Sequence, residues 1–233
     1  MQNKPLLVFI PGTLCTSEMF LPIIDELNCD SVLIDFDQHN SLEAMSNQVL
    51  TTVGNRAFIP VGFSMGGMVA FELMRIVSEQ IQGLILLNSN AHTDAPDKKV
   101  NREKHLELAK KNGLKSLIQQ VYLPVYFSNT DCSHCHSVMN MAEKLGLDVF
   151  EAQLQVLAAR PDSFDVLAAN TKPTLILGAD NDLPCPPKQQ RLMADSSQSA
   201  ELHILPYCGH FAPLEQPKKI ANIINLWINK HYA

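Results

Sequence analysis

One serine has neighbours that could make it a nucleophile. Ser64 lies in the stretch Phe58 to Met74, FIPVGFSMGGMVAFELM. The apolar run before Ser64 predicts a buried parallel strand, and the apolar spacing after it predicts a buried helix. Such an abrupt turn crowds the backbone, and Gly62 and Gly66 fit there because they carry no Cβ. We therefore expect Ser64 to project its hydroxyl from a tight corner.

A serine hydroxyl needs a base to take its proton, and the base needs a third group to fix its tautomer. His210 has the context of such a base, because it follows a glycine and the predicted strand Leu202 to Leu205. That position is the carboxyl edge of the sheet, where Ser64 also emerges. The histidines without this context are His39, His92, His105, His134, His136, His203 and His231.

Two motifs resemble those of the α/β-hydrolase family. GFSMGG resembles its nucleophile elbow, G-x-S-x-G, and CGHFAPLEQP, from Cys208 to Pro217, resembles its histidine loop. The resemblance implies a catalytic triad in the chain order nucleophile, acid and base, beginning at Ser64 and ending at His210.

The resemblance also implies an oxyanion hole made of two backbone amides. One is the amide of Met65, at the positive end of the helix dipole. The other comes from the loop IPGTLC after the first strand, where we expect Thr13, with Leu14 as the fallback. Family members often have His-Gly where this chain has Pro11-Gly12, and Gly12 still allows close approach of the backbone.

The acid implied by the resemblance follows the predicted strand Thr174 to Leu177, in GADNDLPCPP. This segment offers Asp180 and Asp182. We favour Asp182, because the acid in related sequences is commonly followed by three residues and then a proline, here Pro186. The loop is one residue longer before Asp182 than in the commonest pattern, so Asp180 stays open. Either aspartate could instead cap the next helix or turn.

Strands and helices alternate along most of the chain. The predicted strands are Leu6 to Ile10, Val32 to Phe36, Phe58 to Phe63, Ile81 to Leu87, Thr174 to Leu177 and Leu202 to Leu205. Predicted helices cover about 18–27, 42–53, 65–74, 188–194 and 217–230. This alternation predicts an α/β fold with a doubly wound, mostly parallel sheet, which is the α/β-hydrolase fold that the motifs imply.

The alternation stops between residues 90 and 172. Helical patterns take over there, at 102–111, 114–121, 137–144 and 147–158. We expect residues 1–90 and 173–233 to form the α/β-hydrolase core and residues 91–172 a helical cap insertion over the pocket. From this insertion Arg160 could bind a substrate carboxylate. The alternative is an arginine at a helix end that pairs with Asp162 or Asp165.

Composition excludes several classes of partner. With 233 residues and a net charge of -6, the chain offers no basic patch for nucleic acid. The N-terminal apolar run, in MQNKPLLVFIPG, is too short for a signal sequence or a membrane span. We therefore expect a cytoplasmic protein without membrane contact, in which the six cysteines are reduced thiols.

One short segment resembles a metal- or haem-binding motif. Residues 132–136 read Cys-Ser-His-Cys-His and contain C-x-x-C-H. A structural zinc site needs a second ligand pair, and the sequence has none at a suitable spacing. We interpret the segment as a solvated loop and expect neither a metal nor another cofactor.

These observations predict a serine hydrolase that cleaves small carboxylic esters through an acyl-enzyme. Ser64, Asp182 and His210 are the predicted triad, and a small acyl or ester molecule is the predicted partner. Two alternatives stay open. One keeps the triad but hydrolyses C–C bonds, opens lactones or eliminates like the lyase of the menaquinone pathway. The other is a ligand-binding protein without catalysis, since a fold does not dictate a function.

Overall fold

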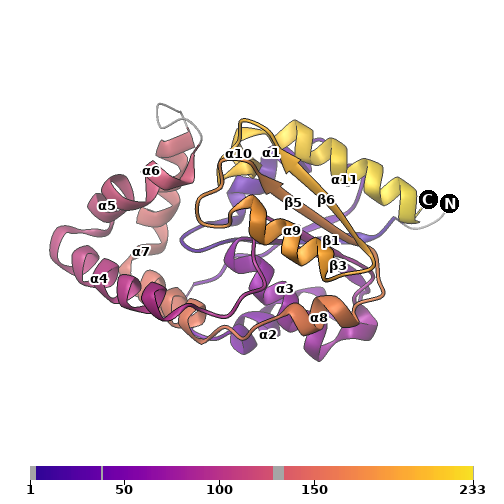
Figure 1. Cartoon of the computed structure of the whole chain (residues 1–233), viewed down its shortest axis with the longest axis horizontal. Helices are drawn as coiled ribbons and strands as arrows, with labels where there is room; N and C mark the ends of the chain where they lie inside the picture. Colours follow the sequence, from indigo (N-terminus) through magenta and orange to yellow (C-terminus); the bar gives the residue numbers. More distant parts are fainter. Residues whose placement is uncertain (1–3, 38, 128–133, 233) are drawn as a thin grey trace.

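A sheet of six parallel strands lies at the centre of the computed structural model, with helices on both faces (Figure 1). The structure describes residues 4–37, 39–127 and 134–232. The strand order is β2-β1-β3-β4-β5-β6. The strands are β1 Leu6–Ile10, β2 Ser31–Leu33, β3 Phe58–Phe63, β4 Leu84–Leu87, β5 Thr174–Ala179 and β6 Ala200–Leu205. The predicted fold class is confirmed.

Alternate side chains of β1 enter two separate cores. In β1, Leu7 and Phe9 pack into the core on one face, whereas Val8 and Ile10 pack into the core on the other. Because both faces are covered, the strand is buried at every position, as its unbroken apolar run predicted. The sheet is thereby a rigid support for whatever its strand ends carry.

Helices of the core region cover these faces. They are η1 Ser17–Phe20, α1 Leu21–Ile24, α2 Leu42–Val53, α3 Met65–Ile76, η2 Ser78–Gln80, α9 Pro187–Asp195, α10 Ala212–Glu215 and α11 Pro217–Tyr232. The Ser41 hydroxyl caps α2 by accepting a hydrogen bond from the Ala44 amide at 3.1 Å. The helix predicted over 18–27 is instead a 3₁₀ turn followed by a short helix, and Pro22 stands in the first turn of that second helix.

Between β4 and β5, the described residues contain helices and no strand. They are α4 Pro96–Asn112, α5 Leu114–Leu117, the π-helical η3 Ile118–Tyr122, α6 Leu123–Tyr126, α7 His134–Ala159 and α8 Phe164–Ala169. We call residues 91–172 the helical insertion; α4 to α7 lie to one side of the sheet in Figure 1. The predicted break at 145–146 is a kink at Gly146, where φ is 84°. No described helix is both long and apolar enough to cross a membrane.

The turn from β3 into α3 has almost no free space. A Cβ on Gly62 would lie 2.5 Å from the carbonyl oxygen of Gly66, and a Cβ on Gly66 would overlap the carbonyl oxygen of Ile10. Both obstacles are backbone atoms, which cannot move aside as a side chain can. Ser64, between the two glycines, has a φ of 51°.

This crowding predicts the effect of Gly66→Ala. We expect the substitution to lower the free energy of unfolding by about 3 kcal/mol, because β1 and α3 must separate to admit the methyl group. Urea denaturation measures the change. Ser64→Ala, which removes only a hydroxyl from the same turn, is the matched control and should unfold close to the wild type. A Gly66→Ala variant as stable as this control would show that crowding does not require glycine here.

Candidate active site

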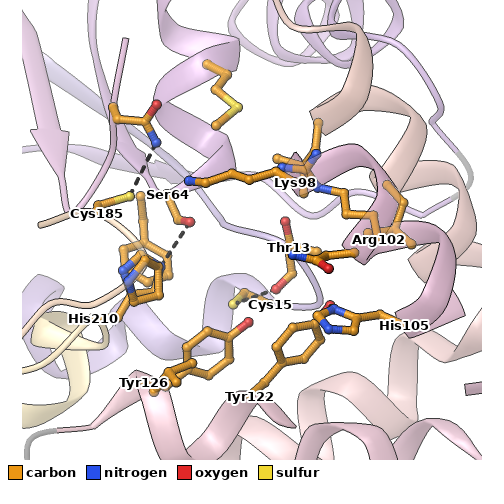
Figure 2. A pocket seen from close by; sticks show the side chains of 18 of the residues that line it. Thr13, Cys15, Ser64, Lys98, Arg102, His105, Tyr122, Tyr126, Cys185 and His210 are labelled. Atoms are coloured by element: carbon orange, nitrogen blue, oxygen red, sulfur yellow. Dashed lines mark hydrogen bonds between the residues drawn. The ribbon is translucent and has the colours of Figure 1, made fainter. Parts of the chain in front are cut away.

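Three side chains from distant parts of the chain form one hydrogen-bonded series. His210 Nε2 lies 3.1 Å from Ser64 Oγ, the contact drawn as a dashed line in Figure 2. On the other side of the ring, Nδ1 lies 2.9 Å from Asp182 Oδ1 and 3.1 Å from Oδ2. A carboxylate only accepts, so Nδ1 carries the ring proton and Nε2 is left to accept from the serine hydroxyl. The arrangement can deprotonate Ser64.

Strand ends deliver these side chains to one edge of the sheet. Ser64 follows β3, Asp182 follows β5 and His210 follows β6, and all neighbouring strands are parallel. The carboxyl ends of parallel strands meet at the same edge, which is why the sequence could predict the convergence. His210 and Asp182 are buried, and Ser64 is half-buried and faces a cavity.

Asp182, and not Asp180, lies beside His210. The carboxylate of Asp182 also accepts hydrogen bonds from the Cys185 amide at 2.8 Å and from Asn88 Nδ2 at 2.9 Å. These two donors fix the direction in which the carboxylate points.

Asp180 instead supports the histidine loop. Its carboxylate accepts hydrogen bonds from the amides of Tyr207 at 2.9 Å and Cys208 at 3.1 Å. Burial raises the pKa of Asp180, but the backbone hydrogen bonds outweigh this effect and lower the pKa below its ordinary value. Asp180 therefore holds the backbone that carries His210.

Asn88 is a site residue that the sequence analysis missed. It is fully buried at the end of β4, and its φ of 47° turns it back toward Asp182. Its Nδ2 also lies 3.4 Å from the carbonyl oxygen of Gly209, next to the histidine. Asparagine tolerates positive φ better than most residues, so an asparagine directly after a buried strand was the available signal.

Helix α6, which no sequence pattern predicted, also holds the histidine. The carbonyl oxygen of Tyr126, at the end of α6, accepts hydrogen bonds from the amides of His210 at 2.7 Å and Phe211 at 3.3 Å. The Tyr126 ring stacks on the His210 ring with centroids 5.6 Å apart. The helical insertion thus helps to hold His210 in place.

The predicted oxyanion donors, Thr13 and Met65, are neighbours: the Thr13 hydroxyl lies 3.7 Å from the Met65 sulfur. Met65 begins α3, so its amide has no acceptor within the helix. Neither amide has a protein acceptor among the described residues. Leu14, the fallback, is different: its amide donates to Gln153 Oε1 at 2.7 Å. Two free amides beside the nucleophile suit a developing oxyanion.

A cavity of about 320 Å³ opens over Ser64. This is near the lower end of the range for small-molecule sites. Its apolar lining comes from both the sheet region and the helical insertion and includes Phe63, Met68, Val125, Leu154, Leu157 and Phe211. The lining suits a small acyl group.

Arg160 lines this cavity, but its guanidinium is bound to protein. It forms an ion pair with Asp94 at 2.9 Å and donates to the carbonyl oxygens of His92 at 2.9 Å and Leu157 at 2.7 Å. Burial is the main cause that lowers its pKa, and the charge of Asp94 opposes it. The partners expected from local spacing were wrong, because Asp162 and Asp165 contact Arg75 instead. A substrate role for Arg160 stays a prediction.

One group of described side chains could in principle hold a metal ion: the ligand atoms of Asp182, Cys185 and His210 lie within 4.8 Å of one another. Burial raises the pKa of the Cys185 thiol to about 12, and Asp182 adds to the rise. The thiol is therefore protonated at neutral pH, whereas a metal ligand is a thiolate. This set of side chains is therefore better suited to proton transfer than to metal binding.

The C-x-x-C-H motif begins at Cys132, outside the described residues, and Cys135 is buried in α7.

The sequence profile described as "Alpha/beta hydrolase family" matches residues 7–223. The chain belongs to the alpha/beta hydrolase family. No curated protein matches this chain by sequence.

Solved structures of alpha/beta hydrolases share its fold. An esterase from Thermogutta terrifontis, with malate bound, has a TM-score of 0.89 at 24% identity and covers 100% of this chain and 92% of that chain. The enol-lactonase from Burkholderia xenovorans LB400 has a TM-score of 0.86 at 18% identity, over 97% and 92% of the two chains. MenH from S. aureus has a TM-score of 0.86 at 17% identity, over 100% and 96%. At these identities the likeness concerns the fold.

Asp182 and Asp180 have different hydrogen-bond partners, so their substitutions should affect different properties: the rate at which Ser64 is labelled, and the melting temperature. Asp182→Asn should slow the labelling of Ser64 by a fluorophosphonate about 10³-fold or more, because His210 loses the acceptor that fixes its tautomer. Asp180→Asn should label near the wild-type rate but melt at a lower temperature, since it weakens two hydrogen bonds to the histidine loop. Labelling rates by mass spectrometry and thermal melting separate the two. The reverse pattern would assign the acid to Asp180.

Proposed function

We propose that the protein is a serine hydrolase that cleaves small carboxylic esters. The observation that carries this proposal is the position of His210, whose two ring nitrogens lie 3.1 Å from Ser64 Oγ and 2.9 Å from Asp182 Oδ1. Such a series activates a serine hydroxyl for acyl transfer. The esterase among the structures of the same fold is consistent with it.

In the first half-reaction, Ser64 Oγ attacks the ester carbonyl while His210 Nε2 takes its proton. The carbonyl oxygen becomes an oxyanion and receives hydrogen bonds from the amides of Thr13 and Met65. Each amide stabilises the transition state by about 3 kcal/mol. His210 then gives the proton to the departing alcohol, and the acyl group stays on Ser64. Asp182 stabilises the imidazolium during these steps.

In the second half-reaction, water takes the place of the alcohol. His210 removes a proton from the water, whose oxygen attacks the acyl-enzyme. Collapse of the second oxyanion releases the carboxylic acid and returns the proton to Ser64. The sum is one ester and one water converted into one acid and one alcohol, and the chain's own side chains carry every proton.

A lactone is an internal ester, so lactone opening is the second candidate for the same triad. The enol-lactonase among the structures of the same fold supports lactone opening as a candidate. Here the alcohol stays attached to the acyl group, and a single product leaves. C–C bond cleavage and the lyase reaction are less well supported, because free amides beside an activated serine suit acyl transfer directly. The cytoplasmic location stays a prediction.

The proposal predicts the behaviour of Ser64→Ala. On p-nitrophenyl acetate and butyrate, kcat should fall by about 10⁴-fold or more, because the attacking oxygen is gone. Intact-mass spectrometry of the wild type with a slow ester should show an acyl adduct that the variant lacks. Ser116→Ala, on α5 and away from the cavity, is the matched control. Full activity of Ser64→Ala would exclude the mechanism, and turnover of lactones alone would favour the second candidate.

A further inference from the structure

One wall of the cavity is basic. Lys98, Arg102 and His105 lie on α4 at spacings of four and three residues, which places them on one face of the helix, and all three line the cavity. In Figure 2 these side chains extend from α4 on one side of the pocket, opposite Ser64 and His210.

Two of the three groups are already satisfied by the protein. Arg102 forms a close ion pair with Asp94, the same carboxylate that pairs with Arg160. His105 Nδ1 lies 2.9 Å from the Tyr122 hydroxyl. Burial, assisted by the charge of Arg102, lowers the pKa of His105, so this ring is neutral at pH 7.

Lys98 is different. Among the side chains that the structure describes, which do not include those of Pro96 and Asp97, no carboxylate lies within ion-pair distance of its ammonium. Lys110 and Lys144, by contrast, pair with Glu151 and Glu18. Lys98 is only half-buried, on a cavity wall that is largely apolar. A charge in such surroundings gains from an anion that shares the cavity with it.

The ammonium of Lys98 lies on the reactive side of the cavity. Its side chain points toward Ser64 in Figure 2. The positive charge of Lys98 is also felt at the Cys185 thiol, where it opposes the rise in pKa that burial causes. Cys185 in turn donates its amide to Asp182. An anion bound by Lys98 would therefore sit close to the scissile carbonyl.

We propose that Lys98 binds a carboxylate of the substrate, so that the hydrolase prefers short esters that carry one free carboxylate. This inference rests on the proposed function and adds the substrate class. One ammonium that pairs with no described carboxylate matches one carboxylate charge, whereas a phosphate monoester would bring nearly two. The cavity of about 320 Å³ limits the substrate to a small molecule.

The test compares two esters of equal shape. Monomethyl glutarate ends in a carboxylate, and methyl 4-carbamoylbutanoate ends in a neutral amide. We expect the wild type to favour the charged ester in kcat/KM by about 10- to 100-fold, as for one hydrogen bond to a charged group. Lys98→Met should bring the ratio to about 1, and Lys98→Arg should keep the preference because it keeps the charge. Lys99→Met, at the exposed neighbouring lysine, is the matched control and should behave as the wild type.

A second arm places the carboxylate on the alcohol half, as O-butyrylglycolate against the butyrate ester of glycolamide. A Lys98-dependent preference in this arm alone also supports the carboxylate site and assigns it to the alcohol. Equal rates within both pairs, or a preference that survives in Lys98→Met, would overturn the inference while leaving ester hydrolysis intact.

If no ester is hydrolysed, the proposed function fails, and binding decides the inference separately. Glutarate should then raise the melting temperature of the wild type, with a much smaller rise for Lys98→Met and a full rise for Lys99→Met. Glutaramide, the neutral diamide, should raise none of them. Equal rises with glutarate in all three proteins, or none, would overturn the carboxylate site.

Discussion

The close packing of three backbone segments at the turn from β3 to α3 is the constraint on which the site depends. Gly66 lies against the carbonyl oxygen of Ile10 in β1, and Gly62 lies against Gly66 itself. Because the segments meet without side chains between them, the turn is sharp and Ser64 is held at a positive φ. The hydroxyl consequently projects from the sheet, and the first amides of α3 open into the space beside it. The remaining parts of the fold bring His210, Asp182 and a cavity to that point.

Asn88, which follows the neighbouring strand β4, also has a positive φ. Asn88 directly follows β4 with a φ of 47°, as Ser64 directly follows β3 with a φ of 51°. Ser64 presents its hydroxyl to His210 and Asn88 orients Asp182, so the two positions act at opposite ends of the same hydrogen-bonded series. Backbone strain of this kind persists where surrounding packing enforces it, and here a fully parallel, doubly covered sheet does so. The packing that stabilises the fold therefore also maintains the geometry of the site.

The sequence predicted the parts of the site that local pattern determines. Ser64 and His210 follow apolar runs, and a parallel sheet brings such positions to one edge, so their meeting followed from topology. Contacts between elements with weak sequence patterns could not be predicted from topology. The alternative to a substrate role for Arg160 was a pairing with the nearby Asp162 or Asp165, yet its partner is Asp94, across the insertion. Helix α6 is one short turn with a proline at its start, and its support of His210 depends on a backbone carbonyl, which has no sequence signature.

The hydrogen bond from the Leu14 amide to Gln153 limits how the helical insertion of this fold can be exchanged. It is buried, and it joins the loop after β1 to α7 across most of the chain. A buried amide left without an acceptor costs about 1–3 kcal/mol. Transplanting a different helical insertion onto this sheet would therefore disturb the loop that holds Thr13, unless the incoming helix offered a carbonyl or carboxamide oxygen at the same point. New cavity linings are accordingly easier to reach by exchanging side chains along α4 than by replacing the whole helical insertion.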